Sequence, residues 1–205
     1  MLIRDVNTII ARYVCRASDM LLIDIHRIDW SELSRNPHPR AIALLRTNPD
    51  KIDWSRLSMN PHPDAVALLR ANPNKIHWVW LNRNTHPSAI ALLCANQDKI
   101  DWIYLSVNTT PDAIALLCAN QNKINWLMLS VNQHPDAIAL LRANSYEIDW
   151  SQLSANTHPD AIVLLRANPD RIKWNLLSHN HVLFTPDPVR YRTNVDRMTK
   201  ILTRM

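Results

Sequence analysis

Histidine, the side chain used most often for metal binding and proton transfer, recurs in this chain at a spacing of 24 residues or a multiple of it. Five histidines form this column, each directly before a proline: His38, His62, His86, His134 and His158. The ligands of one zinc ion lie about 2 Å from it, and side chains one repeat apart are too widely spaced to share an ion. We therefore expect no metal site, and we predict that each histidine caps the helix that its proline begins.

Cysteine can act as a nucleophile, form a disulfide or bind a metal, and the chain contains three: Cys15, Cys94 and Cys118. Cys94 and Cys118 stand one repeat apart, whereas a disulfide needs Cα atoms within about 7 Å. No histidine or acid is placed locally to activate either thiol. An odd number of cysteines without metal spacing fits a reducing compartment, so we expect an intracellular protein that is not secreted.

The chain has no glycine among its 205 residues. Phosphate-binding loops need glycine so that the backbone can approach the phosphate closely. We therefore expect no cofactor and no small-molecule substrate. No apolar run is long enough to span a membrane, and the charged N-terminal stretch does not fit a signal peptide.

The elements that position these side chains repeat every 24 residues, with the consensus IDWSxLSxNPHPDAIALLRANPDK. Four columns run through seven copies without interruption, namely Ile28 to Ile172, Trp30 to Trp174, Leu33 to Leu177 and Asn36 to Asn180. Periods of 20–50 residues are typical of solenoids. We predict one continuous domain, with a helical cap over residues 1–27, seven repeats over 28–180, and a basic cap or tail over 181–205.

Each repeat is predicted to form two helices. In HPDAIALLRAN the proline stands at the first helical position and the apolar residues follow helical spacing. A shorter helix of about seven residues begins at DWSxLS, with Asp29 as its cap. We expect the tryptophan column to be core, and the two asparagine columns to end helices in the left-handed conformation in place of glycine. A leucine-rich horseshoe is disfavoured because serine breaks the strand alternation.

The PDAIALL helix and the NP turns resemble the leucine-rich repeat variant class of α-solenoids. The phrases IxWxxLSxNP and AIxLLxxNP are more closely similar to tandem repeats in uncharacterised proteins of large nucleocytoplasmic DNA viruses. In those arrays a phrase such as NPxIFEIDY often closes the series, and HNHVLFTPDPVRY, residues 179–191, resembles a degraded form of it. The resemblance covers roughly residues 28–191 and implies an all-α superhelix of viral origin, but no activity.

The charges of the array are mixed. Within residues 29–180 there are 14 Lys and Arg against 13 Asp and Glu, and most of the net charge of +5 lies at the chain ends. Acidic and basic residues that alternate along the array favour a surface on which charges pair with each other over a continuous basic surface that binds nucleic-acid phosphates. Nucleic-acid binding by the basic columns and the basic C-terminal tail is therefore the alternative function, not the first choice.

Directly after the tryptophan of the repeat column, three central repeats carry apolar residues where the other repeats are mainly polar. An enzyme would instead need a polar cluster at the place where the repeat pattern breaks. The residues concerned are Val79, Trp80, Ile103, Tyr104, Val107, Leu127, Met128 and Val131. If stacked helices lie about 8–10 Å apart, these side chains form a patch some 20–30 Å long. Exposed patches of this kind, with Trp, Tyr and Met, are typical of protein interfaces.

We therefore predict a non-enzymatic scaffold that binds a protein through this patch, most simply a second copy of itself about a two-fold axis. Two alternatives stay open. The C-terminal tail could fold back over the patch, or the apolar residues could have arisen by neutral sequence drift and have no function.

Overall fold

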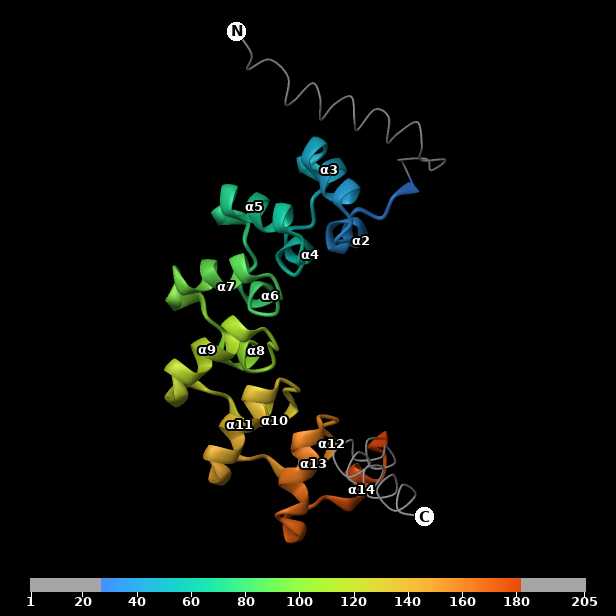
Figure 1. Cartoon of the computed structure of the whole chain (residues 1–205). Coiled ribbons are helices and arrows are strands. Elements are labelled where there is room, and N and C mark those ends of the chain that lie inside the picture. Colours follow the sequence, from blue (N-terminus) through green and yellow to red (C-terminus); the bar gives the residue numbers. More distant parts are fainter. Residues whose placement is uncertain (1–26, 182–205) are drawn as a thin grey trace, which may run out of the picture. The chain divides into compact units, whose positions relative to one another are not determined.

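The computed structural model describes residues 27–181, and within that range the chain forms thirteen α-helices, short 3₁₀ turns and no strand (Figure 1). The expected caps, residues 1–27 and 181–205, lie outside the described residues except for Arg27 and His181. Helices alternate between a short and a long type at regular spacing. The prediction of an all-helical fold built from repeating helix pairs is confirmed for the described range.

The short helices each begin at a tryptophan of the column that runs from Trp30 to Trp174. They are α2 (Trp30–Arg35), α4 (Trp54–Ser58), α6 (Trp78–Leu81), α8 (Trp102–Ser106), α10 (Trp126–Val131), α12 (Trp150–Ala155) and α14 (Trp174–Leu177). They have four to six residues, fewer than the seven expected. Because one or two turns are marginal alone, they depend on their neighbours for stability.

The long helices each begin at a proline. They are α3 (Pro39–Thr47), α5 (Pro63–Ala71), α7 (Pro87–Cys94), α9 (Pro111–Ala119), α11 (Pro135–Ala143) and α13 (Pro159–Arg166). A 3₁₀ turn leads from each long helix to the next short one. These turns are η2 (Pro49–Lys51), η3 (Pro73–Lys75), η4 (Gln97–Lys99), η5 (Gln121–Lys123), η6 (Ser145–Glu147) and η7 (Pro169–Arg171).

The chain divides into two compact units, Met1–Asn125 and Trp126–Met205, of which residues 27–125 and 126–181 are described. In the first unit the short helices α2, α4, α6 and α8 form one row and the long helices α3, α5, α7 and α9 another (Figure 1). In the second unit α10, α12 and α14 pack in series, as do α11 and α13. The prediction of one continuous domain stays a prediction.

The core lies between the two helix types and is built from the leucine column. Leu57, Leu81, Leu105, Leu129 and Leu153 are all fully buried. An alanine and an isoleucine or valine from each long helix are buried against them, such as Ala113 and Ile114 in α9. The tryptophans differ from our expectation, since Trp30 to Trp150 are only half-buried and Trp174 is 63% exposed. The indoles therefore border the core, and the leucines fill it.

Asparagine ties each repeat to the one before it. The Asn60 Nδ2 donates to the carbonyl oxygens of Ser34 and Asn36 at 2.9 and 3.0 Å, and its Oδ1 accepts from the His62 N–H. The same ladder is formed by Asn84 and Asn108 in the first unit and by Asn156 in the second. Each of these side chains is buried, so the ladder satisfies backbone groups that water cannot reach.

The prediction that the asparagines adopt the left-handed conformation is wrong. Asn36 has φ −71° and ψ 118°, and Asn72 has φ −131° and ψ 62°. Both have negative φ, which any residue can adopt. The second asparagine column works through its side chain instead, because the Asn72 Nδ2 donates to the Leu68 carbonyl at 2.9 Å and so caps the end of α5. Asparagine replaces glycine here by hydrogen bonding, not by backbone geometry.

A serine column adds a second link between repeats. The Ser58 hydroxyl donates to the Trp54 carbonyl at 2.7 Å and accepts the His77 N–H of the next repeat at 3.0 Å. Directly after α6 the column carries Asn82, whose Nδ2 donates to the Trp78 carbonyl while its Oδ1 accepts the Asp101 N–H. Within residues 27–181 no buried side-chain nitrogen or oxygen lacks a hydrogen-bond partner. Both polar columns therefore hold neighbouring repeats in register.

Candidate interaction surface

The predicted interface residues of the first unit lie on α6 and α8. Val79, Trp80, Tyr104 and Val107 are half-buried, and Ile103 is 48% exposed. The buried residues of the same helices, Leu81 and Leu105, point into the core. Because a helix separates its core face from its outer face, the extra apolar residues lie off the core face of α6 and α8, and their role as an interface stays a prediction.

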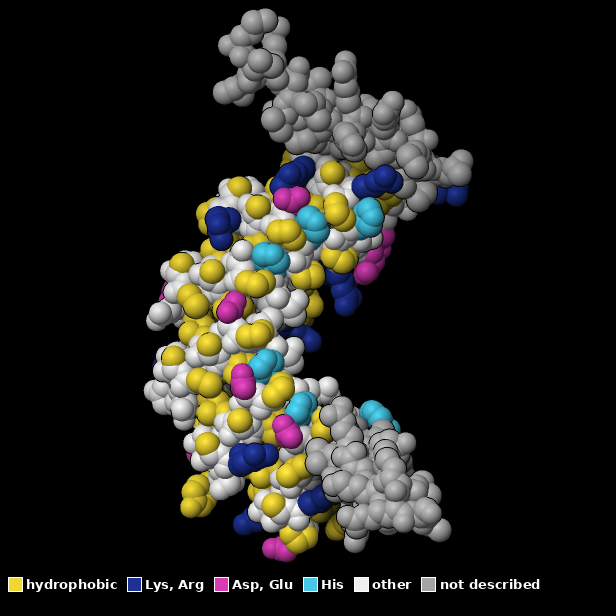
Figure 2. All heavy atoms as spheres, viewed as in Figure 1, with side chains coloured by type: hydrophobic (Ala, Val, Ile, Leu, Met, Phe, Trp, Pro, Cys, Tyr) yellow, Lys and Arg dark blue, Asp and Glu magenta, His cyan; other side chains and the backbone are white. Residues whose placement is uncertain are grey.

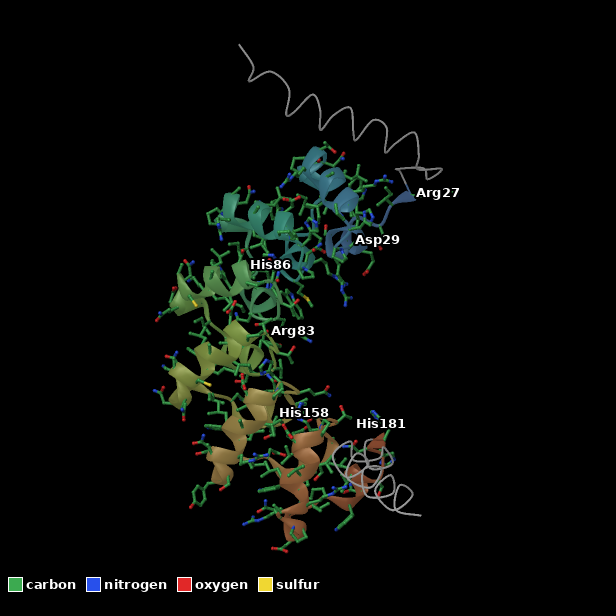
Figure 3. The ribbon with its side chains drawn as sticks, viewed as in Figure 1. Arg27, Asp29, Arg83, His86, His158 and His181 are labelled. Carbon is green, nitrogen blue, oxygen red and sulfur yellow. The ribbon has the colours of Figure 1, made fainter. Side chains whose placement is uncertain are left out.

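Trp80 and Tyr104 contact each other across one repeat. Their ring centroids are 6.3 Å apart with an interplanar angle of 46°, a separation within the range of about 4.5–7 Å in which aromatic pairs attract. The guanidinium carbon of Arg83 lies 5.9 Å from the centroid of each ring. Figure 3 shows Arg83 on the side of the ribbon formed by α6 and α8, away from α7 and α9. We call these three residues and His77 the aromatic–arginine cluster.

His77 contacts Trp80 and does not cap α6 through its side chain. In neighbouring repeats Asp53 and Asp101 cap the short helix by accepting backbone N–H bonds. His77 makes no such side-chain bond to α6, and its ring centroid lies 6.0 Å from that of Trp80. The α6 repeat has therefore exchanged a helix cap for an aromatic contact, which costs helix stability and extends the ring surface.

The aromatic–arginine cluster has an uncompensated charge. Arg56 on α4 pairs with Glu32 at 3.5 Å, whereas within the described residues Arg83 makes no ion pair with a carboxylate. A guanidinium held over two rings keeps its N–H groups available for a planar carboxylate. The surface therefore combines two partly exposed aromatic rings with one free positive charge, the composition that dominates the energetics of protein interfaces.

The remaining predicted interface residues belong to α10 in the second unit. Leu127 is 42% exposed, Val131 is 41% exposed, and Met128 is half-buried. These residues are outward-facing on their own helix, around the buried Leu129 and Ser130. The structure thus brings Trp80 and Tyr104 together in the first unit and exposes two apolar side chains of α10 in the second.

Sequence reasoning missed Arg83 and His77 as members of the surface. Arg83 occupies a column that also contains Arg35, so its residue type gave no signal. His77 did give one, because it replaces the aspartate of Asp29, Asp53 and Asp101 at a capping position. What the sequence could not supply is the distance from the Arg83 guanidinium to both rings.

The histidine column caps helices as predicted. In α5 the His62 Nδ1 accepts the Asp64 N–H at 3.1 Å, and Thr110 replaces the histidine in α9 through its own oxygen. An acid lies beside three of these imidazoles, with Nδ1 to carboxylate distances of 3.8–4.0 Å. Figure 2 shows histidine side chains at the surface, several next to acidic ones. No group of three potential metal ligands occurs among residues 27–181.

Several basic side chains of the array are paired within their own repeat or with the next one. Arg46 contacts Asp64 at 3.3 Å, and Lys99 contacts Asp98 at 2.8 Å. Part of the positive charge of the described residues is therefore paired with acids. Cys94 and Cys118 are free and exposed.

Comparison with known proteins adds no relative. Neither a protein-family model, nor a curated protein, nor a solved structure matches this chain. The resemblance to viral tandem-repeat proteins and the intracellular location therefore stay predictions. None of the helices over residues 27–181 is long and apolar enough to cross a membrane.

Proposed function

We propose that this protein is a non-enzymatic α-solenoid scaffold of seven repeats that associates with a second copy through the outer face of its central short helices. The observation that carries the proposal is the aromatic–arginine cluster, where Trp80 and Tyr104 stay partly exposed under an unpaired Arg83. Trp80 and Tyr104 stand where other repeats carry Glu32, Arg56 and Gln152, so the repeat itself does not require an aromatic ring at this position. In the second unit, Leu127 and Val131 of α10 are a separate pair of exposed apolar side chains.

The stacking part of the proposal is supported by the two polar ladders. Asparagine and serine link repeat to repeat by the same hydrogen bonds in each unit. Identical units joined by identical bonds propagate as a solenoid, in which each repeat contacts its neighbours. Such an array presents its outer positions as rows, which suits a binding surface.

Nucleic-acid binding is the weaker alternative because four basic side chains of the array are already paired with acids. Arg46, Lys51, Arg56 and Lys99 each lie within 4 Å of a carboxylate. A phosphate would have to displace these acids. If nucleic acid were the partner, the logarithm of the affinity would fall linearly and steeply with the logarithm of salt concentration.

The test is the mass of the full chain in solution with the surface intact and altered. The double variant Trp80→Ser, Tyr104→Ser is expected to be monomeric under conditions where the wild type associates, with unchanged helix content by circular dichroism. Val163→Ser is the matched control, because Val163 is an apolar residue 52% exposed on α13, outside the proposed surface. Equal association of the double variant and the wild type would rule out this surface.

A further inference from the structure

The turn η6, Ser145–Glu147, breaks the repeat pattern at all three of its positions. The other five described turns read Pro or Gln, then Asp or Asn, then Lys or Arg. In η6 the middle position is Tyr146 and the last is Glu147, so an aromatic ring replaces a small polar group and an acid replaces a base. Since the turn keeps its 3₁₀ geometry, these replacements do not serve the local fold.

Both side chains of this turn are directed to solvent. Tyr146 is 100% exposed, more than any other large apolar side chain among the described residues, and Glu147 is also exposed. In the regular turns η2 and η4 the acid and the base pair with each other, as Asp50 does with Lys51 at 3.6 Å. Glu147 has no ion-pair partner within residues 27–181. The turn therefore presents a ring and an unpaired carboxylate.

The two irregular places of the array are chemically complementary. The aromatic–arginine cluster offers two partly exposed rings and an unpaired guanidinium, and η6 offers one exposed ring and an unpaired carboxylate. A ring of η6 can stack on Trp80 or Tyr104. The carboxylate of Glu147 can then accept charge-assisted, bidentate hydrogen bonds from Arg83. Each group supplies what the other lacks.

We infer that η6 of a second copy of this chain is the segment that occupies the aromatic–arginine cluster. This inference rests on the proposed function and specifies its contact, with Tyr146 against the rings and Glu147 on Arg83. Every copy carries both groups, so one copy can supply η6 and the other the aromatic–arginine cluster.

The first test restores the regular turn. The variant Tyr146→Asp, Glu147→Lys gives η6 the residues Asp and Lys that other turns carry, so its folding is matched to that of the wild type. Sedimentation velocity of the full chain should show self-association weakened by about tenfold or more, the effect of losing interface side chains of this kind. The control is Asn122→Asp in η5, which introduces a residue that other turns carry at the same position. It should leave the association unchanged.

The second test asks whether Arg83 and Glu147 contact each other. Arg83→Glu and Glu147→Arg should each weaken association, and the double variant with the charges exchanged should regain most of it. Failure of the exchange to restore association, or a turn variant that associates like the wild type, overturns the inference while leaving the proposed function intact. A wild type that does not associate, or whose association is independent of Trp80 and Tyr104, overturns the proposed function and the inference with it.

Discussion

Asn84 is hydrogen-bonded to Asn60 across one full repeat, with its Nδ2 donating to the Asn60 carbonyl oxygen at 2.9 Å. The same nitrogen donates to the Ser58 carbonyl, and its amide oxygen accepts the His86 N–H. One buried side chain thereby makes two hydrogen bonds to the preceding repeat and one to the residue that caps α7. This ladder is the main polar connection between the repeats of each unit.

Replacing Asn84 by alanine should lower the free energy of unfolding by about 3 kcal/mol, because buried groups lose their partners in addition to the bonds themselves. Urea unfolding followed by circular dichroism measures the change. Asn96→Ala is the matched control, since the half-buried Asn96 makes one local bond to the Leu92 carbonyl. Its loss should be near 1 kcal/mol, and equal losses in the two variants would contradict a special role for the ladder.

Burial separates two neighbouring apolar residues of α8. Leu105 is fully buried and Ile103 is 48% exposed. Leu105→Ala should cost about 2–5 kcal/mol because it leaves a cavity in the core. Ile103→Ser should change the unfolding free energy by roughly 0.5 kcal/mol or less. The account of which face of α8 is outward fails if thermal or urea denaturation ranks the two variants the other way.

Histidine capping predicts that the nature of the substitution matters at His62. His62→Ala removes the Nδ1 acceptor of the Asp64 N–H and should cost about 1 kcal/mol. His62→Asn keeps an acceptor at the same place and should recover most of that stability. The pair is compared by urea midpoint at fixed pH, and the same loss in both variants would mean that His62 contributes through packing alone.

Asp53 predicts a stability that depends on pH. Burial raises the pKa of its carboxyl, but hydrogen bonds from the Arg56 N–H, the Ser31 hydroxyl and the Ser55 N–H outweigh that effect, so the pKa lies below its ordinary value. A lowered pKa in the folded state means that this contribution is complete above the ordinary carboxyl range and is lost as pH falls through the folded pKa.

The Ser31 hydroxyl donates to Asp53 at 2.7 Å, so removing it tests the cause of the lowered pKa. Ser31→Ala should raise the pKa of Asp53 toward its ordinary value, as followed by NMR titration of the side-chain carboxyl. Asp53→Asn should flatten the corresponding acid limb of the unfolding curve. A pKa unchanged by Ser31→Ala would show that the backbone donors alone set it.

Sequence periodicity predicted the helix pairs and their proline and histidine starts, because each depends on local spacing. It did not predict the ladders, since a buried asparagine bonded to another repeat and a helix-ending asparagine look alike in a sequence. The half-burial of the tryptophans was missed for a related reason. Residue size suggests burial, but only the packing shows that the leucines already fill the core.

The candidate surface was only partly readable from the sequence. Loss of polarity in adjacent repeats marked Trp80 and Tyr104, whereas Arg83 is an ordinary member of its column and becomes significant only through its position over both rings. Tyr146 and Glu147 depart visibly from their columns, yet their meaning depends on exposure and on the absence of an ion pair for Glu147 within the described residues.

The most direct test of the central claim is the mass of the full-length wild-type chain, measured by sedimentation equilibrium from low micromolar concentration to the solubility limit. Self-association through the outer face of the short helices predicts a weight-average mass that rises with concentration from 23.7 kDa toward twice that value. A mass that stays at 23.7 kDa throughout the range would contradict it.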